Sequence, residues 1–158
     1  MKYDFSLASI SDASEILALY HSLIGTEGCA WNVDYPNMEF VESDIRNESL
    51  YILKDGDKII AATYAGQIDE LAELSWSPKK PCELARLAVR ADMQKKGIAS
   101  LLLGHVKRAV KERGFDGIVM MVSKANPPAI ALYDRNGFVR CGEVFMFEID
   151  FYCYEAKI

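Results

Sequence analysis

Apolar residues recur along the chain with two spacings, one typical of helices and the other typical of strands. Positions 13–24 are apolar every three to four residues, which predicts a helix with one buried face. The strand-like runs at 50–53 and 58–65 flank an Asp-Gly-Asp turn, which predicts a hairpin. By the same reasoning we predict strands at 3–7, 83–89 and 118–122, helices at 9–24, 37–46, 98–113 and 127–135, and two antiparallel strands within 138–157 with their turn at 148–150.

The segment from 83 to 122 indicates the fold class. A strand, a helix and a second strand follow one another at a length that predicts a parallel strand–helix–strand unit. Residues 118–122 are all apolar, as expected for a strand covered on both faces. With the hairpin and the tail strands, the unit predicts an α/β fold with a mixed sheet, in a single domain over residues 1–158. The long connection at 67–81 is of a kind that often carries function.

Composition and charge narrow the classes of function. No apolar run approaches the roughly 20 residues needed to cross a bilayer, and the first residues lack the features of a signal peptide, so we expect a cytoplasmic protein without a membrane partner. The net charge of −5 argues against nucleic acid as a partner. The four cysteines do not have zinc-site spacing; we expect no metal and interpret the cysteines as small apolar core residues.

The most informative local pattern links the first strand of the parallel unit to its helix. Residues 94–99 read Gln-Lys-Lys-Gly-Ile-Ala. Gly97 and Ala99 allow a ligand to approach the backbone closely, and the free N–H groups of a helix start attract phosphate. Lys95 and Lys96 add positive charge in a chain that is acidic overall. An ordinary strand-to-helix turn with exposed lysines fits the loop equally well, so the loop alone leaves both interpretations open.

A second pattern gives this loop a known context. Leu87-Ala88-Val89 precede the loop, and Asn126 opens a later helix that carries Tyr133 and is followed by Gly137-Phe138. Residues 83–138 thereby resemble the GNAT superfamily, the acetyl-coenzyme A-dependent N-acetyltransferases, which share this strand, a Gln/Arg-x-x-Gly-x-Gly/Ala loop and an Asn…Tyr…Gly-Phe segment. The resemblance implies that family's fold, a mostly antiparallel sheet with one splayed parallel strand pair, flanked by about four helices.

The resemblance also implies acetyl-coenzyme A as co-substrate and a way of binding it. The pyrophosphate would lie on the loop amides, and the pantetheine arm would run along the backbone of the preceding strand. Asn126 would hydrogen-bond the pantetheine as well as cap its own helix, for which Asn before Pro127 is well suited. Ala99 stands where glycine is more frequent in the family. The implied coenzyme-binding residues are Leu87, Ala88, Val89, Gln94, Lys95, Lys96, Gly97, Ile98, Ala99, Ser100 and Asn126.

Two residues are candidates for the chemistry, which needs an acceptor for the proton of the amine and a donor for the leaving thiolate. In several GNAT enzymes a glutamate at the position of Glu83 is the general base, and the resemblance implies that role here. Glu83 could instead anchor the substrate ammonium group, or be an exposed charge at the entry of a strand. Tyr133 matches the family tyrosine that protonates the coenzyme sulfur. Its alternative is a core aromatic residue on an amphipathic helix.

No pattern in the first half of the chain identifies the acetyl acceptor. We expect the primary amine of a small molecule or peptide. In the loop at 25–36, Trp31 and Tyr35 either line the acceptor pocket or pack on the domain. A non-catalytic acyl-coenzyme A sensor is the alternative function, and exposed tail strands leave both a monomer and a homodimer open.

Overall fold

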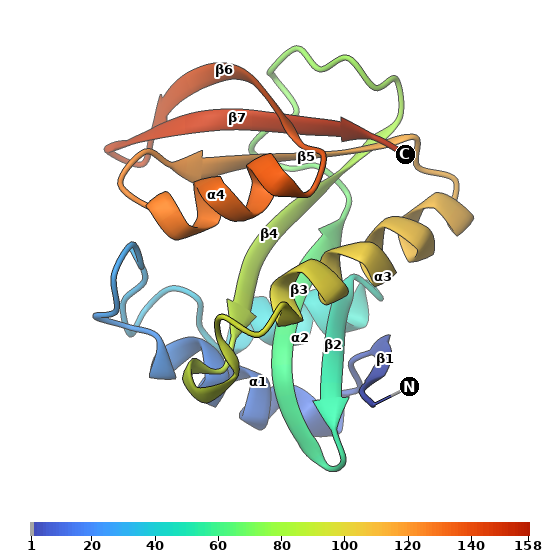
Figure 1. Cartoon of the computed structure of the whole chain (residues 1–158), viewed down its shortest axis with the longest axis vertical. Coiled ribbons are helices and arrows are strands. Elements are labelled where there is room, and N and C mark those ends of the chain that lie inside the picture. The colour runs from blue at the N-terminus through green and yellow to red at the C-terminus, as the bar shows by residue number, and fades with distance from the viewer. Residues whose placement is uncertain (1) are drawn as a thin grey trace.

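The computed structural model describes residues 2–158, which build a seven-stranded mixed sheet (Figure 1). The strands stand in the order β1-β2-β3-β4-β5-β7-β6, and every neighbouring pair is antiparallel except β4 with β5. The mixed sheet with one parallel pair and four flanking α-helices confirms the predicted fold class. The elements are β1 (Asp4–Leu7), η1 (Ile10–Asp12), α1 (Ala13–Ser22), α2 (Met38–Arg46), β2 (Leu50–Asp55), β3 (Lys58–Gly66), β4 (Pro81–Val89), η2 (Ala91–Met93), α3 (Ile98–Glu112), β5 (Gly117–Ser123), α4 (Pro127–Arg135), β6 (Val139–Met146) and β7 (Ile149–Lys157).

The predicted position of the turn between the two tail strands was wrong. The chain reverses at Phe147-Glu148, between β6 and β7, and not at 148–150. Both turn residues have positive φ, 56° and 61°, which suits a two-residue hairpin turn. Asn-Gly or Asp-Gly usually marks such a turn, and Phe-Glu carries no such signal.

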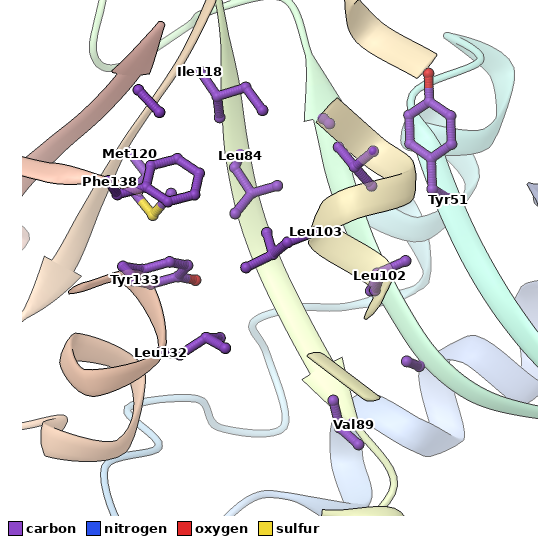
Figure 2. Close-up of a cluster of buried hydrophobic side chains, with 14 of the residues drawn as sticks. Tyr51, Leu84, Val89, Leu102, Leu103, Ile118, Met120, Leu132, Tyr133 and Phe138 are labelled. Atoms are coloured by element: carbon purple, nitrogen blue, oxygen red, sulfur yellow. The ribbon is translucent and has the colours of Figure 1, made fainter. Parts of the chain in front are cut away.

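Helices cover both faces of the sheet, with α3 and α4 in front and α1 and α2 behind in Figure 1. The rear cluster of buried side chains includes Ile16, Tyr20 and Val41. The front cluster, seen in Figure 2, includes Leu102 and Tyr133. Strand β5 is buried on both faces, as its unbroken apolar sequence predicted. None of the helices in residues 2–158 is long and apolar enough to cross a membrane.

The parallel contact between β4 and β5 is short. It joins only Pro81 to Gly117, Cys82 to Ile118 and Glu83 to Val119. A bulge follows in β4, where Arg86 has a φ of 52° and the register with β3 shifts. Beyond Glu83 the two strands therefore diverge, as Figure 1 shows, and the edge of β4 facing β5 lacks a strand partner in residues 2–158.

Gly117 sets the start of β5, and replacing it with alanine tests how tightly that end is packed. A Cβ at this position would lie 2.3 Å from Cγ of Pro78 and 3.0 Å from the carbonyl oxygen of Ala156. We expect Gly117→Ala to lower the free energy of unfolding by about 1–3 kcal/mol through overpacking. Gly142→Ala in β6 is the matched control, because a Cβ there meets nothing within 4 Å. Thermal unfolding of both variants tests this expectation. Equal melting temperatures for Gly117→Ala and Gly142→Ala would contradict overpacking at Gly117.

Candidate functional site

The loop between β4 and α3 presents free backbone N–H groups. Gly97 is the residue before α3 and has a left-handed φ of 79°, and Lys95 has a φ of 61°. The first bond of the helix runs from the N–H of Leu101 to the carbonyl of Gly97, at 3.0 Å. The three N–H groups of residues 98–100 have no main-chain acceptor among residues 2–158. At the positive end of the helix dipole, such groups favour the approach of an anion.

The underside of this loop is fixed while its outer side is open. Met93 is buried beneath it, and the side-chain amide of Gln94 donates to the carbonyl oxygen of Val89 at 3.0 Å. Gln94 therefore braces the loop. A Cβ at Gly97 would meet nothing within 4 Å, and Lys95 and Lys96 are exposed. The loop leaves room for a ligand directly in front of its amides.

The strand before the loop offers a second set of backbone groups. Leu87 and Val89 lie in the divergent part of β4, whose edge toward β5 is unpaired in the described chain. Leu87 and Val89 pack on the front cluster and Ala88 on the rear one, so side chains of β4 contact both faces. An extended ligand with amide groups could pair with this edge as an added strand does.

Asn126 and Ser100 have structural partners. The side-chain oxygen of Asn126 accepts the N–H of Ala129 at 3.3 Å, so Asn126 is the N-cap of α4. Gly28 of the loop between α1 and α2 lies against it, since a Cβ at Gly28 would be 2.5 Å from that oxygen. Ser100 accepts a hydrogen bond from the side chain of Asn136 at 3.0 Å, which ties the start of α3 to the end of α4.

Tyr133 is buried in the front cluster, 7% exposed, with its ring edge-on to Phe138. Figure 2 shows its side chain reaching from α4 toward β4, with the hydroxyl at the far end. Burial raises the pKa of this hydroxyl, which therefore stays protonated at neutral pH. Burial is the sole cause of this shift, and no hydrogen bond joins the hydroxyl to another of residues 2–158, so its proton is available to a ligand.

Glu83 lies where β4 and β5 begin to diverge. It is 6% exposed, and one carboxyl oxygen accepts the N–H of Asp69 at 3.2 Å. Burial raises the pKa of Glu83 to about 7; Glu70 raises it further, whereas the Asp69 N–H and Arg86 lower it. The interpretation as an exposed charge is thereby excluded. The flanking residues of β4, Cys82 and Leu84, belong to the front cluster, so Glu83 points to the opposite face from Tyr133.

Arg86 forms a network that the sequence did not reveal. Its guanidinium forms a buried ion pair with Asp44 at 3.0 Å and donates to the hydroxyl of Tyr35 at 3.1 Å. It also lies over the rings of Phe40 and Tyr64 at 5.3 and 5.0 Å. Burial lowers the pKa of Arg86, but Asp44 and Tyr35 raise it by more, and the charge is retained. Arg86 and Asp44 are 42 positions apart, and no local pattern joins them.

A hollow on the rear side of the sheet brings several of these residues together. Glu83, Arg86 and Asp44 line it, along with Asp69 and Glu70 from the connection between β3 and β4. The long connection predicted at residues 67–81 ends at residue 80 in the structure, and its Asp69 donates a hydrogen bond to Glu83. The full lining is Phe40, Ser43, Asp44, Asn47, Tyr64, Gln67, Asp69, Glu70, Glu83 and Arg86.

The two candidate pocket aromatics differ in position. Trp31 packs edge-on against Tyr20 at 5.3 Å and adds to the rear cluster. Tyr35 is 37% exposed and accepts a hydrogen bond from Arg86, which lines the hollow. Neither Trp31 nor Tyr35 is itself among the residues that line it.

The residues that often bind metals are scattered. Among residues 2–158 no three His, Cys, Asp or Glu side chains gather in a way that could hold a metal ion. Cys82 and Cys153 are buried, as a core role predicts. Cys141 is exposed on β6, so the interpretation as a core residue is wrong for it.

Comparisons with known proteins agree on one family. Residues 16–138 match the model of the acetyltransferase (GNAT) family. N-acetyltransferase 8 of Rattus norvegicus is 26% identical over 101 residues, 64% of this chain but only 44% of that protein, so the chain spans less than half the length of this relative.

Two solved structures share the fold at low identity. The ribosomal-protein-S18-alanine N-acetyltransferase of Escherichia coli superposes with a TM-score of 0.75 at 19% identity, over 99% of this chain and 94% of that one. The PaiA N-acetyltransferase of Thermoplasma acidophilum, in complex with coenzyme A, gives 0.77 at 17% identity, over 100% of both chains.

The raised pKa of Glu83 has a consequence for stability. The folded protein binds this proton more tightly than the unfolded chain, so stability falls as pH rises from about 4.5 to about 7. We expect Glu83→Gln to exceed the wild type in unfolding free energy by on the order of 2–3 kcal/mol at pH 8, and to match it near pH 4.5. Denaturant unfolding at both pH values measures this. Glu73→Gln, which neutralises an exposed acid of the same connection, should show no such pH-dependent gain; an equal gain there would contradict the assignment.

Proposed function

This chain belongs to the acetyltransferase (GNAT) family, and we propose that it transfers the acetyl group of acetyl-coenzyme A directly to a primary amine of a small molecule or peptide. The observation that carries the proposal is Glu83, a buried carboxyl group with a pKa of about 7. It lies where β4 and β5 separate, on the same strand that leads to the anion-binding loop. A proton acceptor suited to neutral pH is what an amine nucleophile requires.

The residues present fit the coenzyme. The free N–H groups of residues 98–100 and the exposed lysines 95 and 96 would hold the pyrophosphate. The unpaired edge of β4 at Leu87 and Val89 would bind the amides of the pantetheine arm, and the amide group of Asn126 at the start of α4 is a further candidate donor. When bound, acetyl-coenzyme A supplies an electrophilic thioester carbonyl.

Glu83 acts in this proposal as the general base. An alkylamine is almost wholly protonated at neutral pH and has no free lone pair until a proton leaves. With a pKa of about 7, Glu83 is ionised in a large fraction of molecules at that pH. Its carboxylate accepts the proton directly or through water. Loss of a general base lowers kcat, whereas loss of a substrate anchor raises KM, so kinetics distinguish the two roles.

Tyr133 acts from the other face of the sheet. Its protonated, unpaired hydroxyl reaches toward β4, where it would donate to the departing thiolate. Glu83 and Tyr133 thus approach the gap between β4 and β5 from opposite sides. A sensor that only binds acyl-coenzyme A would need neither group, which favours the enzyme over that alternative.

Binding of the coenzyme is tested at Gly97. Gly97→Val places a side chain in the open space before the loop amides and forces a β-branched residue to a φ of 79°. We expect acetyl-coenzyme A affinity to fall at least tenfold in isothermal titration calorimetry. Gly56→Val in the β2–β3 turn carries a similar backbone strain with open space around it, and should leave affinity unchanged. Wild-type affinity in a folded Gly97→Val variant would refute the loop assignment.

Transfer itself is tested at Glu83. Glu83→Gln keeps the size and removes the basicity, so kcat should fall by roughly 100-fold or more. In the wild type kcat/KM should rise with pH through about 7 as Glu83 ionises, and the variant should lose that limb. A higher KM at unchanged kcat would make Glu83 an anchor instead. Glu73→Gln is again the matched control.

The leaving-group role is tested by Tyr133→Phe. The ring stays in place against Phe138, and the lost hydroxyl has no partner in the described chain, so the melting temperature should be nearly unchanged. We expect kcat to fall by roughly 10–1000-fold, because a hydrogen bond to developing charge is removed. Normal turnover with a lowered melting temperature would show a purely structural tyrosine.

A further inference from the structure

The hollow that contains Glu83 continues into a second one. Asn47, Tyr64 and Gln67 line both hollows, so the two are adjacent along the surface. Gly66, which lines the second hollow, is the register partner of Glu83 across β3 and β4. Arg113 and Phe115, which also line the second hollow, follow the front helix α3, so the pair of hollows runs from the rear side past the start of β2 and the end of β3. We name the two hollows together the strand-end groove.

Opposite charges line the two ends of the strand-end groove. At the first end lie Glu83, Asp69 and Glu70, since the positive charge of Arg86 is already matched by an ion pair. The only charged residue that lines the second end is Arg113. The groove therefore runs from an acidic end to a basic end.

Arg113 is held in place without being neutralised. One nitrogen of its guanidinium donates to the carbonyl oxygen of Glu48 and to the hydroxyl of Tyr51, the latter at 3.0 Å. Both acceptors are uncharged, and Arg113 forms no ion pair with a carboxylate among residues 2–158. Its remaining N–H groups and its charge are free for an anion, and a guanidinium binds carboxylate well.

The stretch between the two ends is polar. Asn47 and Gln67 contribute side-chain amides and are exposed, and Tyr64 stands between the hollows with its hydroxyl bonded to the carbonyl of Gln67 at 2.7 Å. Side-chain amides can form hydrogen bonds with a polar ligand, such as a peptide, but not with a hydrocarbon chain.

We infer that the acetyl acceptor carries a carboxylate several bonds from its reactive amine, as a short peptide does, with the amine at Glu83 and the carboxylate at Arg113. The amine end of this inference rests on the proposed function; the carboxylate end rests on Arg113 alone. A polyamine is disfavoured, because its second ammonium group would face the guanidinium.

The test compares acceptors that differ only at the far end. Di-, tri- and tetraglycine are used as free acids and as C-terminal amides, beside diamines of similar length, and kcat/KM is measured at low salt. We expect the best free acid to exceed its amide by about tenfold or more, as one charge-assisted hydrogen-bonded pair implies. Wild-type enzyme that uses the amides or the diamines as well as the acids overturns the inference, and this arm needs no variant.

Variants of Arg113 and Tyr51 show whether Arg113 causes the preference for free acids over amides. Arg113→Gln should bring the acid-to-amide ratio close to one, and Arg113→Lys should keep most of it. Tyr51→Phe removes a bond made by Arg113 without removing the charge, so its ratio should stay as in the wild type. An undiminished ratio in folded Arg113→Gln overturns the assignment.

A failure of the proposed function gives a different pattern. If none of the acceptors is acetylated, direct transfer to amines of this class is refuted, and the groove is tested by calorimetry on the protein saturated with coenzyme A. Free acids that bind at least tenfold tighter than the amides, and lose that advantage in Arg113→Gln, support the inference. Equal binding of acids and amides, or no binding, overturns it.

Discussion

The short parallel contact between β4 and β5 is the constraint on which the site depends. Three register pairs hold the strands together, and beyond Glu83 they separate. A longer parallel ladder would close the edge of β4 and leave no room for an extended ligand. The tight packing of Gly117 against Pro78 fixes one end of this contact, and the bulge at Arg86 marks the divergence. A left-handed backbone at a non-glycine residue is strained. Arg86 is held in that conformation by its ion pair with Asp44 and by its contacts with the rings of Phe40 and Tyr64.

Burial decides the electrostatics of Glu83. Arg86 is three residues away and favours the ionised carboxylate, as does the N–H of Asp69, yet desolvation outweighs both and the pKa rises. Part of the reason is that the charge of Arg86 is already directed at Asp44. The same ion pair that stabilises the bulge thereby limits how far the guanidinium can lower the pKa of its neighbour on the strand.

Local sequence patterns and the family resemblance predicted most of the fold, and the resemblance proposed part of the candidate site. The helices at 38–46, 98–112 and 127–135 follow from apolar periodicity and caps, because these signals act within a few residues. Glu83 and Tyr133 are candidates for the chemistry only because a family motif fixes their positions. The Arg86–Asp44 pair and the Asp69 N–H on Glu83 join segments 42 and 14 residues apart, and the tertiary fold alone brings them together. The turn at Phe147-Glu148 was missed because neither residue type favours a left-handed backbone.

The net charge of −5 says little about the site, because charges of different sign are separated in space. The anion-binding loop follows β4 at its carboxyl end, with Lys95 and Lys96 beside it. The acidic end of the strand-end groove lies near the other end of β4, at Glu83. The two are joined by β4, which rises about 3.3 Å per residue, so the six strand positions from Glu83 to Val89 already span about 20 Å and exceed the Debye length of about 10 Å at 0.1 M salt. Exposed carboxylates at one end therefore repel a phosphate at the other only weakly, and an acidic protein can carry a site for a polyanion on the same strand as a site for an amine.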